Sequence, residues 1–113
     1  MRIQRLAALA LGALLLVAAA PSRAADGKAV YESICTNCHG PDGHADTKKG
    51  KALKAKSYAD VEELKGSPDE VAAFVKKAVR EDKKHKQISP KVTDEDLAAV
   101  AVYVRVLANA PAK

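Results

Sequence analysis

The sequence has few of the residues that usually build a large core. Its 113 residues contain no tryptophan, and aromatic residues make up 4% of the chain. These residues are Tyr31, Tyr58, Phe74 and Tyr103. A domain of this size with so thin a core usually depends on a disulfide, a metal or a cofactor for its stability.

Long apolar runs are absent apart from one near the N-terminus. Residues 6–20 form this run, Arg2 and Arg5 precede it, and Ser22 and Ala24 follow at the spacing that signal peptidase recognises. The 15 residues of the run are fewer than the roughly 20 that a membrane-spanning helix needs. We therefore predict a cleaved secretory signal, with an uncleaved membrane anchor as the alternative.

Cleavage after Ala24 would change the composition of the working protein. It would leave one domain, residues 25–113, in the periplasm. It would remove Met1, which is the only methionine, together with three of the 19 basic residues and none of the 14 acidic ones, so the net charge would fall from +5 to +2. So small a charge, the few aromatic residues and the predicted export give little support for nucleic-acid binding.

No segment alternates apolar and polar residues for long enough to predict a strand, so we expect an all-α fold. Internal repeats are absent as well. We expect helices over residues 26–35 and 59–64, a third helix that begins at Ser67 and a last helix that begins at Thr93, with a loop over residues 40–56.

The two longest predicted helices have clear starts. Ser67 is a good N-cap residue, Pro68 suits the first helical position, and Glu70 completes a capping box. We expect this helix to end within the charged segment 80–86. Three acidic residues follow Thr93, in the first helical turn, where the helix dipole favours negative charge.

The two cysteines, Cys35 and Cys38, are separated by two residues, and His39 follows directly. This pattern is the attachment signal for c-type haem, in which two thiols bond to the porphyrin and the histidine binds the iron. A redox dithiol would need a strand–helix–strand pattern around it, and a zinc site would need more cysteines or clustered histidines. The sequence has neither, so we predict one covalently bound haem c with His39 as the proximal ligand.

The wider sequence resembles the class I, mitochondrial-type monohaem cytochrome c family. In that family a glycine and an aromatic residue ahead of the cysteines pack against an aromatic residue of the last helix, and Gly27, Tyr31 and Tyr103 match them. Residues 38–43 and 93–104 are similar to the family's stretch after the haem and to its last helix. The resemblance implies a small all-α domain of three to five helices around one haem, a monomer, and single-electron transfer with no enzymatic activity.

The sequence departs from this family at the sixth ligand of the iron. The family usually supplies a methionine from the loop before the last helix, and the only methionine here is lost with the signal. His85 lies in that loop, eight residues before Thr93, and a neutral imidazole is a good haem ligand. We predict His85 as the distal ligand. The alternatives are a lysine (Lys83, Lys84 or Lys86), an open or water-bound iron, and His44, which lies only five residues from His39.

Two further predictions depend on these surroundings. An open or displaceable sixth position would favour a gas sensor, a ligand-binding protein or a peroxidase-like enzyme. Basic residues around His85 predict a surface that steers an acidic redox partner to the haem, and the alternative is a solvated helix end. These residues are Lys76, Lys77, Arg80, Lys83, Lys84 and Lys86, and a second group follows the haem motif at Lys48, Lys49, Lys51, Lys54 and Lys56.

Overall fold

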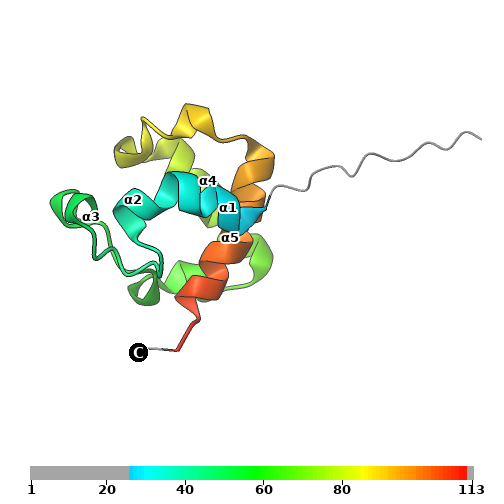
Figure 1. The fold of residues 1–113 in the computed structure, drawn as a ribbon. Helices are drawn as coiled ribbons and strands as arrows, with labels where there is room; N and C mark the ends of the chain where they lie inside the picture. The colour runs from blue at the N-terminus through cyan, green and yellow to red at the C-terminus, as the bar shows by residue number, and fades with distance from the viewer. Residues whose placement is uncertain (1–25, 112–113) are drawn as a thin grey trace, which may run out of the picture.

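The computed structural model describes residues 26–111, which form helices joined by turns and short loops (Figure 1). No strand occurs in this part of the chain, so the predicted all-α fold is confirmed. The predicted signal over residues 1–24 lies outside the described residues. The elements are α1 (Gly27–Val30), a π-helical turn (Tyr31–Cys35), α2 (Thr36–His39), α3 (Lys48–Ala52), 3₁₀ turns at Tyr58–Asp60 and Glu62–Lys65, α4 (Pro68–Glu81), 3₁₀ turns at Lys83–His85 and Ser89–Lys91, and α5 (Asp94–Ala108).

The first helical segment runs from Gly27 to His39 without interruption. Asp26 caps its start, because its carboxylate accepts hydrogen bonds from two backbone N–H groups of the first turn. The prediction that this helix ends near Cys35 is wrong. No residue before Gly40 breaks the helix, and Gly40 ends it with a φ of 78°. The haem motif therefore lies on a helix throughout.

Within this continuous helical segment, residues Tyr31–Cys35 form a π-helical turn that ends at the first cysteine of the motif. The hydroxyl of Thr36 donates a hydrogen bond to the carbonyl of Tyr31 at 3.2 Å, which satisfies an acceptor in the wider turn. Such turns often occur at functional sites. Here the turn ends at Cys35 and so sets the direction from which this thiol leaves the helix.

The region after the first segment contains more structure than its composition indicates. The predicted loop over residues 40–56 holds α3, whose N-cap hydroxyl, on Thr47, accepts from the backbone of Gly50 and donates to the carbonyl of Cys38. The predicted helix over residues 59–64 is instead two 3₁₀ turns separated by Val61. The apolar pattern is too short in both places to distinguish a turn from a helix.

The predicted starts of α4 and α5 are confirmed. Ser67 and Glu70 form a capping box, in which each side chain accepts a hydrogen bond from the other residue's backbone N–H at 3.2 Å. Thr93 and Asp96 form the same arrangement at the start of α5, at 3.0 Å. Within residues 26–111 no helix is both long and apolar enough to cross a membrane.

The helix α5 packs against α1 and α4 and so joins the two ends of the described chain (Figure 1). The ring of Tyr31 is fully buried, and its centre lies 5.2 Å from that of Tyr103. A Cβ atom at Gly27 would overlap the carbonyl of Ala99, so only glycine allows this close crossing. The predicted contact of the first helix with the last is therefore confirmed.

Candidate functional site

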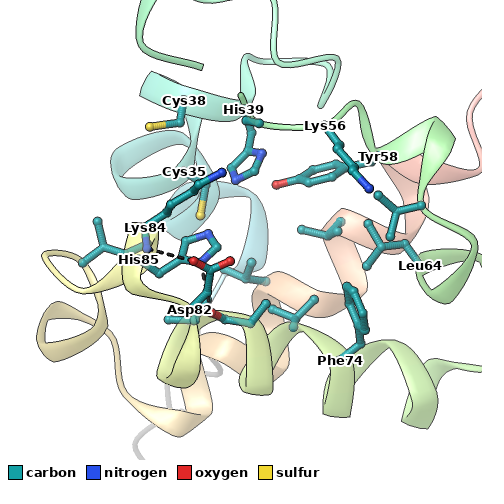
Figure 2. Close-up of a pocket in the computed structure, with 18 of the residues that line it drawn as sticks. Cys35, Cys38, His39, Lys56, Tyr58, Leu64, Phe74, Asp82, Lys84 and His85 are labelled. Atoms are coloured by element: carbon teal, nitrogen blue, oxygen red, sulfur yellow. Dashed lines mark hydrogen bonds between the residues drawn. The ribbon is translucent and has the colours of Figure 1, made fainter. Parts of the chain in front are cut away.

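A cavity of about 430 Å³ lies among the end of the first helical segment, α4, α5 and the loop between these last two helices. This volume falls within the roughly 300–1,000 Å³ typical of cofactor and ligand sites. Cys35, Cys38, His39 and His85 all line it (Figure 2). The structure thus brings together all four side chains that the sequence analysis singled out. Much of the remaining lining is apolar and includes Ile34, Leu64, Phe74, Val79, Leu97 and Val104.

Both cysteines are free and half-buried at one edge of this cavity. In Figure 2 the sulfur of Cys35 lies between the rings of His39 and His85, whereas the sulfur of Cys38 lies nearer the outer edge. Burial, with a smaller contribution from the neighbouring Cys38, raises the pKa of the Cys35 thiol to about 11. Cys35 is therefore a neutral thiol at physiological pH, which suits the apolar wall on which it lies.

His39 reaches the cavity from the last position of α2 (Figure 2). Burial, with a smaller contribution from nearby His85, lowers the pKa of its imidazole to about 4. The ring is neutral at pH 7 as a result, and a neutral imidazole is the form that binds metals. Its Nδ1 atom is buried and has no hydrogen-bond partner among residues 26–111.

The ring of Tyr58 stacks on the ring of His39. The two ring centres are 4.9 Å apart, and the ring planes differ by 29°. The backbone N–H of Tyr58 donates to the carbonyl of Gly43 at 2.9 Å, and a Cβ atom at Gly43 would overlap the Tyr58 ring. Glycine is required there for a second reason, because its φ of 79° lies in the left-handed region. The turn at Gly43 therefore positions Tyr58 against the ring of His39.

His85 faces His39 from the opposite wall, on the 3₁₀ turn that follows α4. Its Nδ1 atom lies 3.0 Å from the carbonyl oxygen of Ala78. A carbonyl only accepts hydrogen bonds, so Nδ1 carries a proton, and in the neutral tautomer of this ring Nε2 holds the lone pair. A backbone carbonyl that fixes the tautomer in this way is a common partner of metal-binding histidines.

The spacing of the two imidazoles fits one metal ion between them. Their ring centres are 6.1 Å apart, and the ring planes differ by 18°. With a metal–nitrogen bond of about 2.0–2.1 Å and about 1.2 Å from each nitrogen to its ring centre, a shared ion requires about 6.5 Å. In Figure 2 a ring nitrogen of His39 points toward the ring of His85. Two thiols at the edge, two opposed imidazoles and an apolar wall fit a covalently bound haem.

The other candidate ligands are placed less favourably. Nδ1 of His44 lies 3.1 Å from the Ser57 hydroxyl, and His44 is not part of the cavity lining. Lys84 lines the cavity, but Lys83 and Lys86 line a separate surface hollow beside α4. Among the sequence candidates other than His39, His85 is thus the one whose ring is opposed to His39.

Sequence reasoning missed the role of Tyr58. It was noted only as one of four aromatic residues, although it is the one between the haem motif and α4. Such an isolated aromatic residue in a lysine-rich stretch is a signal that could have marked it. The contact with His39 itself depends on the turn at Gly43 and could not be read from spacing.

Comparison with known proteins gives a family for this chain. The family model described as cytochrome C oxidase, cbb3-type, subunit III matches residues 22–104, which is most of the sequence. No curated protein and no solved structure matches the chain. The matched segment includes both cysteines of the motif and both histidines of the cavity.

Proposed function

Since the chain belongs to the family of cytochrome C oxidase, cbb3-type, subunit III, we propose that it transfers single electrons between protein partners. Members of this family are monohaem c-type cytochromes, so the chain carries one covalently bound haem c. The haem supplies reversible one-electron chemistry at its iron. The chain attaches the cofactor, fixes its axial ligands and excludes water with the apolar wall. It acts as a monomeric electron carrier and not as an enzyme.

Cys35 and Cys38 hold the haem through thioether bonds, His39 is the proximal ligand and His85 is the distal ligand. The protein is thus a relative of class I cytochromes that uses histidine where they use methionine. The observation that carries this proposal is the opposed pair of imidazoles 6.1 Å apart, with the Ala78 carbonyl leaving Nε2 of His85 free for a metal. Methionine ligation raises the potential of haem iron, so we expect a lower potential here.

The cytochrome works in the periplasm, after removal of residues 1–24 as a signal peptide. The basic run and apolar segment at the start of the sequence support this. Mass spectrometry of the exported protein tests it directly. A mature N-terminus at Ala25 is expected, and a protein that retains Met1 would mean that the segment anchors it to the membrane.

Its partners carry an acidic docking surface. Lys84 lines the cavity, and Lys83 and Lys86 flank it on the same loop. By contrast, Lys76 and Arg80 both pair with Asp94 within the described chain, at 3.4 and 3.0 Å, so part of their positive charge is already compensated. The lysines available for a partner are therefore those of the loop, together with Lys77.

The decisive experiment for the ligation is His85→Ala, followed by optical and electron paramagnetic resonance spectra. The wild type should be low-spin in both oxidation states. Loss of the imidazole should make the ferric haem high-spin and allow the ferrous haem to bind carbon monoxide rapidly. His44→Ala removes a histidine that bonds Ser57 outside the cavity, so this control should keep the wild-type spectrum.

Two outcomes would contradict the proposal. If His85→Ala leaves the spectrum unchanged, another group is the distal ligand. If the wild type is already high-spin and binds carbon monoxide at once, its sixth position is open, and a gas-binding or peroxidase-like function replaces simple electron transfer.

A further inference from the structure

The loop that carries His85 has few anchors of its own. Between the end of α4 and the start of α5 it consists of short turns, with hydrogen bonds from His85 to Asp82, from Ile88 to His85 and from Lys91 to Ile88. These bonds lie within the loop and do not attach it to the rest of the fold. The buried side chain of Val92 fixes the end of the loop in the core, and polar contacts to the helices must add to this hold if His85 is to stay opposite His39.

Arg80, in the last turn of α4, supplies this attachment. One guanidinium nitrogen donates to the backbone carbonyl and the hydroxyl of Ser89. The other donates to the carbonyl of Val92 at 2.9 Å and to a carboxylate oxygen of Asp94 at 3.0 Å. A single side chain thereby joins α4, the far half of the loop and the first residue of α5.

The hydrogen bonds of the Arg80 guanidinium are strong for a side chain near the surface. The guanidinium presents its donors in a rigid fork, so four acceptors are held with little loss of side-chain freedom. The side chain of Arg80 is only 30% exposed. Hydrogen bonds that involve a charged group are stronger than those between neutral groups. Lys76 also pairs with Asp94 and holds the carboxylate in place.

We propose that Arg80 is a positioning residue for the distal ligand: by tying Ser89 and Val92 to α4, its guanidinium holds the loop closed and keeps His85 opposite His39. The loop is fastened to α4 at two points. Near its start, His85 bonds the carbonyl of Ala78, and near its end, Ser89 and Val92 bond Arg80. Loss of the second point leaves the far end of the loop held only by the buried side chain of Val92, without polar contacts to α4. This inference rests on His85 being the distal ligand.

The consequence is a measurable change in how often the sixth position opens. Carbon monoxide reaches ferrous iron only while His85 is dissociated, so its binding rate reports the open fraction. Loss of the fork in Arg80→Ala should raise this rate by about tenfold, which corresponds to about 1.4 kcal/mol. The ferric protein should gain a high-spin fraction and bind added imidazole more tightly. Arg80→Lys keeps the charge but not the fork, and it should also bind carbon monoxide faster than the wild type.

Arg105→Ala is the matched control. Arg105, on α5, donates from Nε to the carbonyl of Gly66 at 2.8 Å and does not touch the loop. It should lower the thermal midpoint while leaving the carbon monoxide rate as in the wild type. Asp94→Asn is a milder variant that weakens the hold on Arg80 without removing it. It should raise the carbon monoxide binding rate by about twofold to threefold, less than 1 kcal/mol. This variant replaces Arg80→Ala in the test if Arg80→Ala does not fold.

Stopped-flow mixing of the reduced holoprotein with carbon monoxide, well below the thermal midpoint, decides the matter. Unchanged rates in Arg80→Ala and Asp94→Asn would overturn the inference, and so would an equal acceleration in Arg105→Ala. Wild-type behaviour of Arg80→Lys would show that the fork is unnecessary, which also overturns it. Failure of the ligation itself looks different, because His85→Ala would then match the wild type whatever Arg80 does.

Discussion

The two walls of the cavity hold their histidines in different ways. His39 ends a continuous helix, lies next to Cys38 in the sequence, and is supported by the stacked ring of Tyr58. His85 lies on a single 3₁₀ turn in a loop and is fixed by one hydrogen bond to a helix carbonyl. One wall is built from local sequence, and the other depends on contacts between segments.

This difference separates two jobs of a haem protein. The proximal side must retain the cofactor through every redox cycle, which covalent bonds and a rigid helix achieve. The distal side sets the ligand field and the access of small molecules, which a loop can vary without loss of the fold. Natural variation in the sixth ligand is therefore expected on the loop side.

The largest expected effect comes from breaking the proximal side altogether. The double variant Cys35→Ala with Cys38→Ala loses the covalent haem, and the cavity walls lose the group that fills them. A void of about 430 Å³ cannot be closed by so small a core, so we expect a chain largely unfolded at room temperature. Circular dichroism during thermal unfolding measures this.

The variant His85→Ala, on the other wall of the cavity, should behave differently from the double cysteine variant. His85→Ala should keep its haem and unfold cooperatively, because the thioethers and the first helix are untouched. A haem-free double cysteine variant that melts near the wild-type temperature would contradict the dependence on haem. So would haem that acidified organic solvent extracts from the wild type, since two thioethers should retain it.

A second prediction concerns the turn behind His39. The buried hydroxyl of Tyr31 donates to the carbonyl of Gly40 at 2.6 Å, and Tyr31→Phe leaves that carbonyl without this donor. We expect a loss of about 1–3 kcal/mol in the free energy of unfolding, measured with denaturant. Tyr103→Phe is the control, because it removes a hydroxyl from the ring next to Tyr31, 5.2 Å away between centres, and leaves the bond to Gly40 in place. An equal loss in both variants would show that the bond to Gly40 adds nothing beyond the loss of a hydroxyl group.

The pH dependence of stability in the wild type and Tyr31→Phe gives a further test of the role of Tyr31. Burial raises the pKa of Tyr31 above its ordinary value near 10. The folded protein thus keeps the phenol neutral, and this part of its stability is present below pH 10 and declines as pH rises further. The phenylalanine variant lacks this titration, so the gap between wild type and Tyr31→Phe should shrink above about pH 10. A gap that widens would contradict the assignment.

The sequence was informative wherever the signal was local. The motif at residues 35–39 predicted the proximal wall, and the capping residues Ser67 and Thr93 predicted the starts of α4 and α5. The end of the first helix was misplaced, because nothing between Cys35 and Gly40 distinguishes a helix that stops from one that continues through a π-turn.

The distal wall was predictable only in part. Composition and position in the loop selected His85, but the sequence contains no signal for its bond to Ala78 or for the four contacts of Arg80. These contacts depend on how α4, the loop and α5 meet in space. Arg80 was interpreted as part of a docking surface, whereas its side chain is directed to Ser89, Val92 and Asp94.

A smaller effect distinguishes the two walls through their helix caps. Thr93→Ala and Ser67→Ala each remove one capping box, and each should cost about 1 kcal/mol of stability. Thr93 adjoins the end of the distal loop, whereas Ser67 starts α4 far along the chain from it. Only Thr93→Ala should therefore speed carbon monoxide binding to the reduced protein. Equal acceleration in both variants would mean that general destabilisation, and not the loop, controls access to the iron.

The smallest effect compares the lysines on the two sides. Lys83 and Lys84 belong to the distal loop, and Lys48 and Lys49 belong to α3, beyond the motif. Replacing either pair with glutamine removes the same charge, so a difference between the pairs locates the surface that a partner approaches. We expect the distal pair to lower the second-order rate of reduction by an acidic partner about threefold at low salt, and the α3 pair to lower it less.

Ionic strength separates steering from contact in the same assay. The Debye length falls from about 10 Å at 0.1 M salt to about 3 Å at 1 M, so a purely electrostatic difference should vanish at the higher value. The wild-type rate itself should fall over this range. A wild-type rate that does not change with salt would mean that the lysines are solvated and do not steer a partner. A threefold difference that persists at 1 M would mean that Lys83 and Lys84 touch the partner directly, which would place the docking site on the loop that carries the distal ligand.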